Sequence, residues 1–359
     1  PRNRILQAIA PRGKGKTKST LSIRDLSFKG YYMTDSGLSG LAAALGTRNP
    51  KNGKAAMPNL KILDLQDNGL TDIAHQTITQ ILNSCPRLTS LNISSNDKFG
   101  FDTARALVAH HIKNGSKASA GSPKGKKGTK NGQLPDLTSP ITTLSMSECP
   151  KMSKEYTLSI QSLLARPKHL RPKFILRELD VSYCHLGDKE GEAICATLRR
   201  WPRAKKLNIS NNMLGEKTGF ALSVALQKHK GIDEIIASKN NFGDNAGVAI
   251  AFAVAVNASL RSFDLAECGF GPNTAAAMGD ALMMSPTIVK LNLAHNPFGA
   301  SGASTLIKSA SLAAQIQAEK NKVAKAEFVQ AEKEKQIQMA KNGKKNNTYD
   351  SSSSGSGKP

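Results

Sequence analysis

Residues 176–186, LRELDVSYCHL, carry the pattern that decides the fold of this chain. The pattern returns four times downstream, as AKKLNISNNML from Ala204, IDEIIASKNNF from Ile232, LRSFDLAECGF from Leu260 and IVKLNLAHNPF from Ile288. The fourth residue of every copy is apolar, at a constant step of 28 residues: Leu179, Leu207, Ile235, Phe263 and Leu291. A fixed period of this length is typical of repeat architectures, in which every unit contributes one layer of a stack.

The pattern also occurs upstream, but with less regular spacing. LKILDLQDNGL from Leu60 and LTSLNISSND from Leu88 keep the step of 28, ITTLSMSECPKM starts at Ile141, and a weaker copy, IRDLSFKGYYM, starts at Ile23. The longer gaps between the other copies predict inserted loops. The largest is residues 113–139, which are rich in Lys, Gly, Ser and Pro, and smaller ones contain NPKNGK and RPKHLRPK.

Each copy alternates apolar and polar residues, as a half-buried strand does, and then turns at an Asn or Cys. A Gly-rich step such as LGDKEG or FGDNAG follows, and a segment with helical spacing completes the unit. One strand and one helix per unit predict an α/β fold, a right-handed solenoid of about 8–9 repeats with a parallel sheet on the concave face and helices on the convex face. No unit can bury its apolar face alone, so stacking makes the core.

The frame L-x-x-L-x-L-x-x-N/C-x-L, followed by G-[DE]-x-x-[GA] and an Ala/Leu helix, resembles the ribonuclease-inhibitor-like leucine-rich repeat. The resemblance covers roughly residues 21–310. Similar repeats occur in Ran GTPase-activating proteins, NOD-like receptors, tropomodulins and several axonemal proteins. Because these proteins bind unrelated partners, the resemblance implies a fold and a binding role without implying a partner.

The sequence predicts four regions. Residues 1–20, with six Lys or Arg and no acid, are interpreted as a basic disordered arm, with a transit peptide as the alternative. The solenoid is predicted over 21–308, with 113–139 as a disordered insertion. Residues 309–341 are predicted to form a charged helix, and 342–359 a disordered tail.

The charged helix has two interpretations. It is a terminal cap that covers the last core face and runs into solvent, or a weak coiled coil. The second interpretation rests on Ile316, Val323, Gln330 and Ile337, which share one heptad position.

The net charge of +23 favours an acidic partner, yet the concave face is predicted to be acidic. Alternate strand residues face the groove. These outward positions are Asp25, Asp64, Asn92, Ser145, Asp180, Asn208, Ile236, Asp264 and Asn292. With their neighbours, the groove holds nine acids against four bases. The predicted partner-binding residues of the concave face are Asp64, Asn92, Asp180, Asn208, Glu234, Asp264 and Asn292.

The positive charge is predicted to lie on the arms and one edge. The predicted contacts with an acidic partner are Arg2, Arg4 and Arg12 in the arm, Lys124, Lys126 and Lys127 in the insertion, and Arg199, Arg200, Trp201 and Arg203 at a helix-to-strand turn. Trp201, the only tryptophan, has two interpretations: it covers the end of the helix core, or it stacks on RNA or an acidic peptide beside the three arginines.

Several kinds of chemistry are not expected. Cys149, Cys184 and Cys268 fall on the turn position of the repeat, so a structural role is expected for them, with the thiols reduced. No catalytic constellation, cofactor motif, metal-ligand spacing or apolar run long enough to span a membrane stands out. We therefore expect a protein without enzymatic activity, cofactor, metal, small-molecule substrate or membrane partner.

The leading functional hypothesis is a scaffold or structural subunit of a larger intracellular assembly. Its groove would bind a protein, and its basic extensions would contact an acidic surface such as tubulin or RNA. The expected location is cytoplasmic, in a cytoskeletal or ciliary setting, with mitochondrial or nuclear locations as alternatives. The alternative functions are a Ran-type GTPase-activating protein and a ribonuclease-inhibitor-like regulatory binder.

Overall fold

The computed structural model describes residues 23–47, 57, 59–117, 141–166 and 175–347. In this part of the chain, nine strands form one parallel sheet in sequence order. The strands are β1 Asp25–Ser27, β2 Ile62–Asp64, β3 Ser90–Asn92, β4 Thr143–Ser145, β5 Glu178–Asp180, β6 Lys206–Asn208, β7 Glu234–Ile236, β8 Ser262–Asp264 and β9 Lys290–Asn292. The predicted solenoid and its number of repeats are therefore confirmed.

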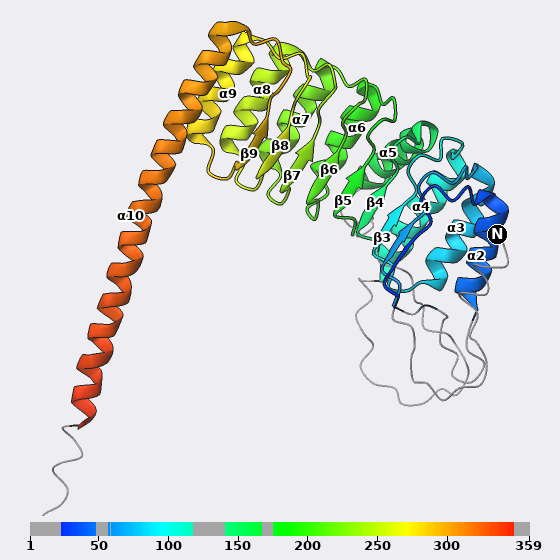
Figure 1. Ribbon diagram of the computed structural model, residues 1–359, viewed down its shortest axis with the longest axis horizontal. Helices are drawn as coiled ribbons and strands as arrows, with labels where there is room; N and C mark the ends of the chain where they lie inside the picture. Colours follow the sequence, from blue (N-terminus) through cyan, green and yellow to red (C-terminus); the bar gives the residue numbers. More distant parts are fainter. Residues whose placement is uncertain (1–22, 48–56, 58, 118–140, 167–174, 348–359) are drawn as a thin grey trace, which may run out of the picture.

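The helices form a second layer on the outer side of the arc, and the strands line its inner side (Figure 1). The helices are α2 Thr34–Gly46, the 3-10 turn η1 Asp72–Ala74, α3 His75–Ser84, α4 Phe101–Lys117, α5 Pro150–Leu164, α6 Asp188–Leu198, α7 Glu216–Lys228, α8 Gly243–Val256, α9 Pro272–Met284 and α10 Gly299–Asn347. Helix α4 continues into residues 113–117, which the sequence assigned to the insertion; residues 118–139 of that insertion lie outside the described residues.

The strand register repeats along the whole sheet. Leu63 pairs with Leu91, and Leu207 pairs with Ile235, so the middle residue of each strand enters the core between the layers. Burying one such side chain is worth about 1.5–3 kcal/mol, and neighbouring repeats share the contact. One position was misassigned: Asp25 pairs with Ile62, whereas Ser27 is the register partner of Asp64. The first repeat therefore places Ser27, not Asp25, in the row that contains Asp64.

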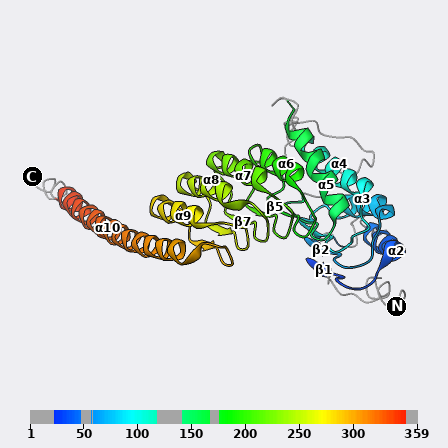
Figure 2. The same ribbon diagram turned by 90° about the horizontal axis from the view of Figure 1, so that it is seen from above.

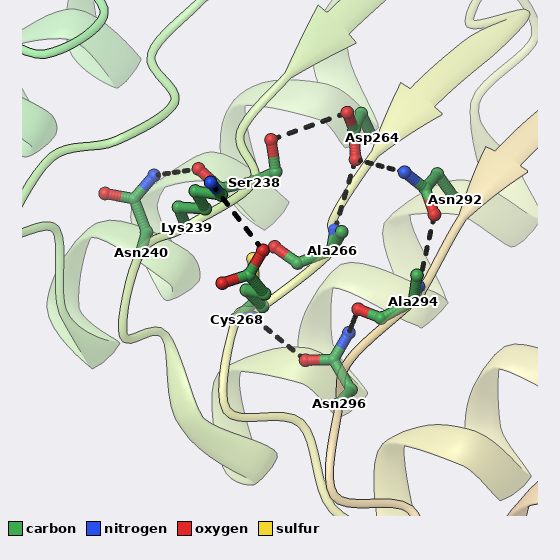
Figure 3. Close-up of polar contacts among 10 residues, drawn as sticks. Ser238, Lys239, Asn240, Asp264, Ala266, Cys268, Asn292, Ala294 and Asn296 are labelled. Carbon is green, nitrogen blue, oxygen red and sulfur yellow. Dashed lines mark hydrogen bonds and ion pairs between the residues drawn. The ribbon is translucent and has the colours of Figure 1, made fainter.

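The turns after β2 to β9 are held by a ladder of Asn and Cys side chains. In Figure 3, Asn296 accepts hydrogen bonds from the backbone of Cys268 at 2.9 Å and donates to Ala294 O. Cys268 Sγ donates to Ala237 O and Ala266 O, and burial raises the pKa of this thiol to about 12. All five cysteines are free and buried, so the expected structural role of Cys149, Cys184 and Cys268 is confirmed.

A second set of contacts ties each of several helices to the next repeat. Asp244 Oδ1 accepts hydrogen bonds from Gly271 N at 2.8 Å, Thr274 N at 2.8 Å and the Thr274 hydroxyl at 2.6 Å. Burial raises the pKa of Asp244, but these bonds outweigh burial, and the pKa lies below its ordinary value. Asp35, Asp72 and Asp188 make equivalent bonds to the following repeat. The sequence frame G-[DE]-x-x-[GA] contains this acid at Asp188 and Asp244, but it does not show the bonds of the carboxylate to the following repeat.

The core between repeats contains Trp201. Its side chain is 1% exposed, and Nε1 donates to Leu176 O at 2.5 Å. The indole therefore packs at the C-terminal end of α6. This agrees with the interpretation that Trp201 covers the end of the helix core. A buried ring cannot stack on RNA or a peptide, so the inclusion of Trp201 among the partner-binding residues was wrong.

His229 continues the core next to Trp201. Its Nδ1 accepts from Gly231 N and Ile232 N at 3.1 and 3.0 Å, so Nε2 carries the proton and donates to Trp201 O at 2.9 Å. Burial lowers the pKa of His229 below its ordinary value, although the bond to Trp201 O acts in the opposite direction. A proton on Nδ1 would break two of these bonds.

Acidification from pH 7.5 to 5.5 is expected to lower the thermal midpoint of unfolding. The unfolded chain takes up a proton on this histidine near pH 6.5, whereas the folded chain takes it up only at lower pH. The stability from His229 is therefore full above about pH 6.5 and is lost as the pH falls towards the folded pKa. In scanning calorimetry, His229→Gln should show a smaller difference between the two pH values than the wild type. His295→Gln, which alters an exposed histidine, should keep the wild-type difference; equal differences in all three proteins would contradict the assignment.

The last helix of the stack is much longer than the others. Helix α10 has 49 residues, starts beside α9 and continues beyond the solenoid (Figures 1 and 2). Its first turns pack closely on α9, where Gly302 lies next to Ala275 and Leu306 lies next to Gly279. From residue 314 to 335, every side chain that the structure describes is exposed. The helix runs without interruption through residues 308 and 309, where the sequence placed a region boundary.

Candidate functional site

The concave face consists of side chains on either side of the buried middle residue of each strand. One row contains Asp25, Ile62, Ser90, Thr143, Glu178, Lys206, Glu234, Ser262 and Lys290. The second row contains Ser27, Asp64, Asn92, Ser145, Asp180, Asn208, Ile236, Asp264 and Asn292. The parallel register therefore places all seven predicted groove residues on one sheet, with Glu234 in the first row and the other six in the second.

The Asp and Asn residues of the second row also have a local structural role. Asp180 Oδ1 accepts from Ser182 N at 3.0 Å, Asn208 Oδ1 accepts from Ser210 N at 3.1 Å, and Asp64, Asn92, Asp264 and Asn292 make the same bond two residues on. Side-chain bonds of this type stabilise turns. One oxygen of each side chain is therefore committed to the turn, and in Asp64, Asn92, Asp264 and Asn292 the other polar atom also hydrogen-bonds to a neighbouring side chain.

The charge of the groove is unevenly distributed. Near the C-terminal end of the sheet, Lys206 pairs with Glu234 at 3.0 Å and Lys239 lies 3.9 Å from Glu267. Across β2–β5, every charged residue at a described groove position is an acid. These acids are Asp64, Asp67, Glu148, Glu178 and Asp180. The acidic character predicted for the whole groove is thus concentrated in one half of it.

A basic row borders this groove where the strands begin. Five exposed basic residues occupy the same place in their repeats, two residues before the middle residue of the strand. They are Arg24, Lys61, Arg177, Lys205 and Arg261. Among them, Lys205 pairs with Asp233 at 3.2 Å. In the sequence, this row falls on the second position of five of the nine repeats; Thr89, Thr142, Asp233 and Val289 occupy that position in the others. The prediction considered only the alternating strand positions and therefore did not include the row.

The predicted basic contacts divide into two groups. Arg199, Arg200 and Arg203 are exposed beside the α6–β6 connection, close in sequence to Lys205 in the basic row. The other predicted contacts lie outside the described residues; they are Arg2, Arg4, Arg12, Lys124, Lys126 and Lys127. The three arginines therefore remain candidates on an edge that also carries the basic row.

The described part of the chain offers little for catalysis. It contains no group of three or more His, Cys, Asp or Glu side chains placed to hold a metal ion. Burial raises the pKa of Cys149 and Cys195 to about 12, which keeps these thiols protonated and poorly nucleophilic. None of the described helices combines the length and apolarity that a bilayer span requires.

A repeat solenoid with a polar groove is typical of a class of binding proteins. Comparison of the sequence with family models identifies the type of repeat. Residues 58–101 match a model of leucine-rich repeats in two copies, and residues 175–195 and 285–306 match a second leucine-rich-repeat model. The chain is a leucine-rich-repeat protein. Proteins built from these repeats are typically binders without catalytic activity. No curated protein sequence matches the chain significantly.

Several solved structures are similar to the chain at low sequence identity. Leiomodin-1 actin-binding site 2 is 18% identical over 48% of this chain and 96% of its own, with a TM-score of 0.36. The yeast Rad7 and Elc1 complex contains a chain that is 17% identical over 76% of this chain and 70% of its own, with a TM-score of 0.37. An internalin, inlF, from Listeria monocytogenes is 13% identical over 85% and 91%, with a TM-score of 0.32.

Proposed function

We propose that this protein is a non-catalytic scaffold of the ribonuclease-inhibitor-like type, whose concave face binds a protein segment that carries basic side chains. The observation that carries this proposal is the acidic half of the groove across β2–β5. Among the described residues its five acids form no ion pair, whereas Glu234 and Glu267 in the other half of the groove each face a lysine of the same protein. Complementary charge on a preformed surface gives a binding partner both orientation and specificity.

The basic row and Arg199, Arg200 and Arg203 have a separate role in this proposal. They contact an acidic surface of the same assembly, such as tubulin or RNA, together with the basic segments 1–20 and 113–139. The net charge of +23 supports this part of the proposal because long-range attraction to an acidic surface grows with net charge. The assembly would be cytoskeletal, axonemal or a ribonucleoprotein.

Reversing two groove charges is expected to weaken partner binding roughly tenfold, because exposed ion pairs are each worth up to about 1 kcal/mol. The variant is Glu148→Lys with Glu178→Lys, since neither carboxylate makes a turn bond of the kind that Asp180 makes. The measurement is recovery of the native complex from cells, with crosslinking mass spectrometry to identify the neighbour and the face it touches.

The matched control is Glu192→Lys with Asp280→Lys, which changes the net charge equally on the exposed outer face of α6 and α9. This control should recover the partner as the wild type does, and crosslinks should map to β2–β5. Equal loss in both variants would show that net charge alone drives binding. Crosslinks confined to the convex face would overturn the proposed site.

A further inference from the structure

Five large apolar side chains are exposed on the outer faces of two neighbouring helices. They form what is here called the α7–α8 patch: Phe220, Val224, Val248, Phe252 and Val256. Phe252 is 60% exposed and Phe220 is 43% exposed. The opposite faces of the same helices supply the core, through Leu222 and Leu226 on α7 and Ile250 and Val254 on α8. The patch is therefore not needed to bury the solenoid core.

The repeat makes this patch continuous. Phe220 and Val248 are equivalent residues one repeat apart, and so are Val224 and Phe252, so they lie side by side across α7 and α8. Their exposed fractions correspond to roughly 400 Å² of apolar surface, within the range of patches that mark an interaction site. Charged residues bound the patch, with Glu192 on α6 and Asp280 on α9.

Helix α10 carries an apolar stripe of its own. At 100° per residue, Leu312, Ile316 and Val323 point within about 40° of one another, and all three are exposed. The stripe begins where contact with α9 ends and lies on the part of the helix that leaves the solenoid (Figure 2). In the described chain, this stripe and the α7–α8 patch are two apolar surfaces on helices of one molecule, and α10 covers neither.

We propose that two copies of this protein dimerise by exchanging α10, so that the α10 stripe of each copy binds the α7–α8 patch of the other. An amphipathic helix bound on an apolar helix face is a common mode of recognition. The stripe cannot reach the patch of its own chain, because α10 is one continuous helix that starts beside α9 and extends away from α7 and α8.

Charge and size both suit this occupant. Charges of both signs flank the stripe, namely Glu319 and Glu327 with Lys320 and Lys322. Charges of both signs also border the patch, where Lys217 and Lys228 on α7 complement the acids of the stripe, and Glu192 and Asp280 complement its lysines. The stripe from Leu312 to Val323 spans about 17 Å, close to the length of the outer face of α8. Exchange gives two identical contacts related by a two-fold axis, which closes the assembly and brings the buried area into the range of stable dimers.

The first test is the oligomeric state of the full chain in 0.3 M salt, which screens the repulsion between two copies of charge +23. Light scattering after gel filtration should give twice the monomer mass at micromolar concentration. Phe252→Lys in the patch and Ile316→Glu in the stripe should each give a monomer. Both side chains are exposed, so the thermal midpoints should stay within a few degrees of the wild type.

Mixing the two variants is the decisive test. A mixed pair keeps one wild-type contact, between the patch of Ile316→Glu and the stripe of Phe252→Lys, and places Lys opposite Glu in the other. A dimer should therefore reappear in the mixture although each variant alone is a monomer. The control is Ile307→Glu, which changes another face of α10. This variant should remain a dimer when it is alone, and adding it to the mixture of the other two variants should not prevent their dimer from forming.

Each alternative gives a different result. If patch bound patch, Ile316→Glu would remain a dimer. If two α10 helices formed a coiled coil, Phe252→Lys would remain a dimer. Either result would overturn the exchange. So would a mixture of the two variants that stays monomeric, or a wild type that is monomeric at 100 times the micromolar concentration of the first test.

Discussion

Replacing Trp201 with alanine is expected to lower the free energy of unfolding by about 3–5 kcal/mol, which is the usual cost of removing a large buried aromatic side chain. The indole fills the junction between two repeats, where Ile160, Leu179 and Ile194 line the neighbouring small cavity. Its loss also leaves Leu176 O without its donor, and an unmet buried acceptor adds to the cost. The damage should extend beyond one repeat because each repeat is stabilised by its neighbours.

The measurement is urea denaturation followed by far-ultraviolet circular dichroism, since Trp201 is the only tryptophan and its removal eliminates the fluorescence signal. Trp201→Phe keeps most of the volume and loses the hydrogen bond, so a loss of roughly 1–3 kcal/mol is expected for it. Arg203→Ala, two residues away and exposed, should change the midpoint little. If Trp201→Ala were as mild as Arg203→Ala, the buried role would be refuted.

Replacing Asn96 with alanine is expected to be of similar severity, at about 3–5 kcal/mol, because it breaks several buried hydrogen bonds at once. Asn96 is 0% exposed. Its Oδ1 accepts from Asn68 N at 3.1 Å and Leu70 N at 3.0 Å, and its Nδ2 donates to Leu65 O, Ile93 O and Ser94 O. Alanine leaves all five backbone groups without these partners.

Two substitutions sharpen this prediction. Asn96→Cys should cost less than Asn96→Ala, because the cysteines at the equivalent positions 149, 184 and 268 still donate from the thiol. Asn83→Ala, on the exposed side of α3, controls for the loss of an asparagine. Chemical denaturation should rank the three as Asn83→Ala, Asn96→Cys and Asn96→Ala in order of increasing loss. A loss from Asn96→Ala below about 1 kcal/mol would contradict the importance of the ladder.

The sequence predicted the parts of this fold that depend on the repeat. Nine strands, their order and the turn positions of Cys149, Cys184 and Cys268 all follow from the recurring frame of the repeat, because equivalent residues in a stack have equivalent surroundings. Asp25 was assigned to the wrong row of the sheet because the first repeat matches the sequence pattern least closely. The burial of Trp201 depends on a backbone acceptor in another repeat, which no local pattern reveals.

The α7–α8 patch was missed for a different reason. The stretch GVAIAFAVAV in α8 is apolar on all sides, so its helical period shows a buried face without showing that the opposite face is apolar too. Val248, Phe252 and Val256, four residues apart, were the available signal. The carboxylate bonds of Asp244 and its equivalents were also hidden, because they join residues about one repeat apart in the chain.

Those carboxylate bonds also bear on how the arc deforms. They join the described repeats through Asp35, Asp72, Asp188 and Asp244, whereas four joints show no equivalent bond among the described residues: β3–β4, β4–β5, β6–β7 and β8–β9. Bending of the arc is therefore expected to concentrate at these four joints. Because the acids of the groove lie on both sides of the two joints at β4, a ligand that spans them would fix the curvature of the arc there.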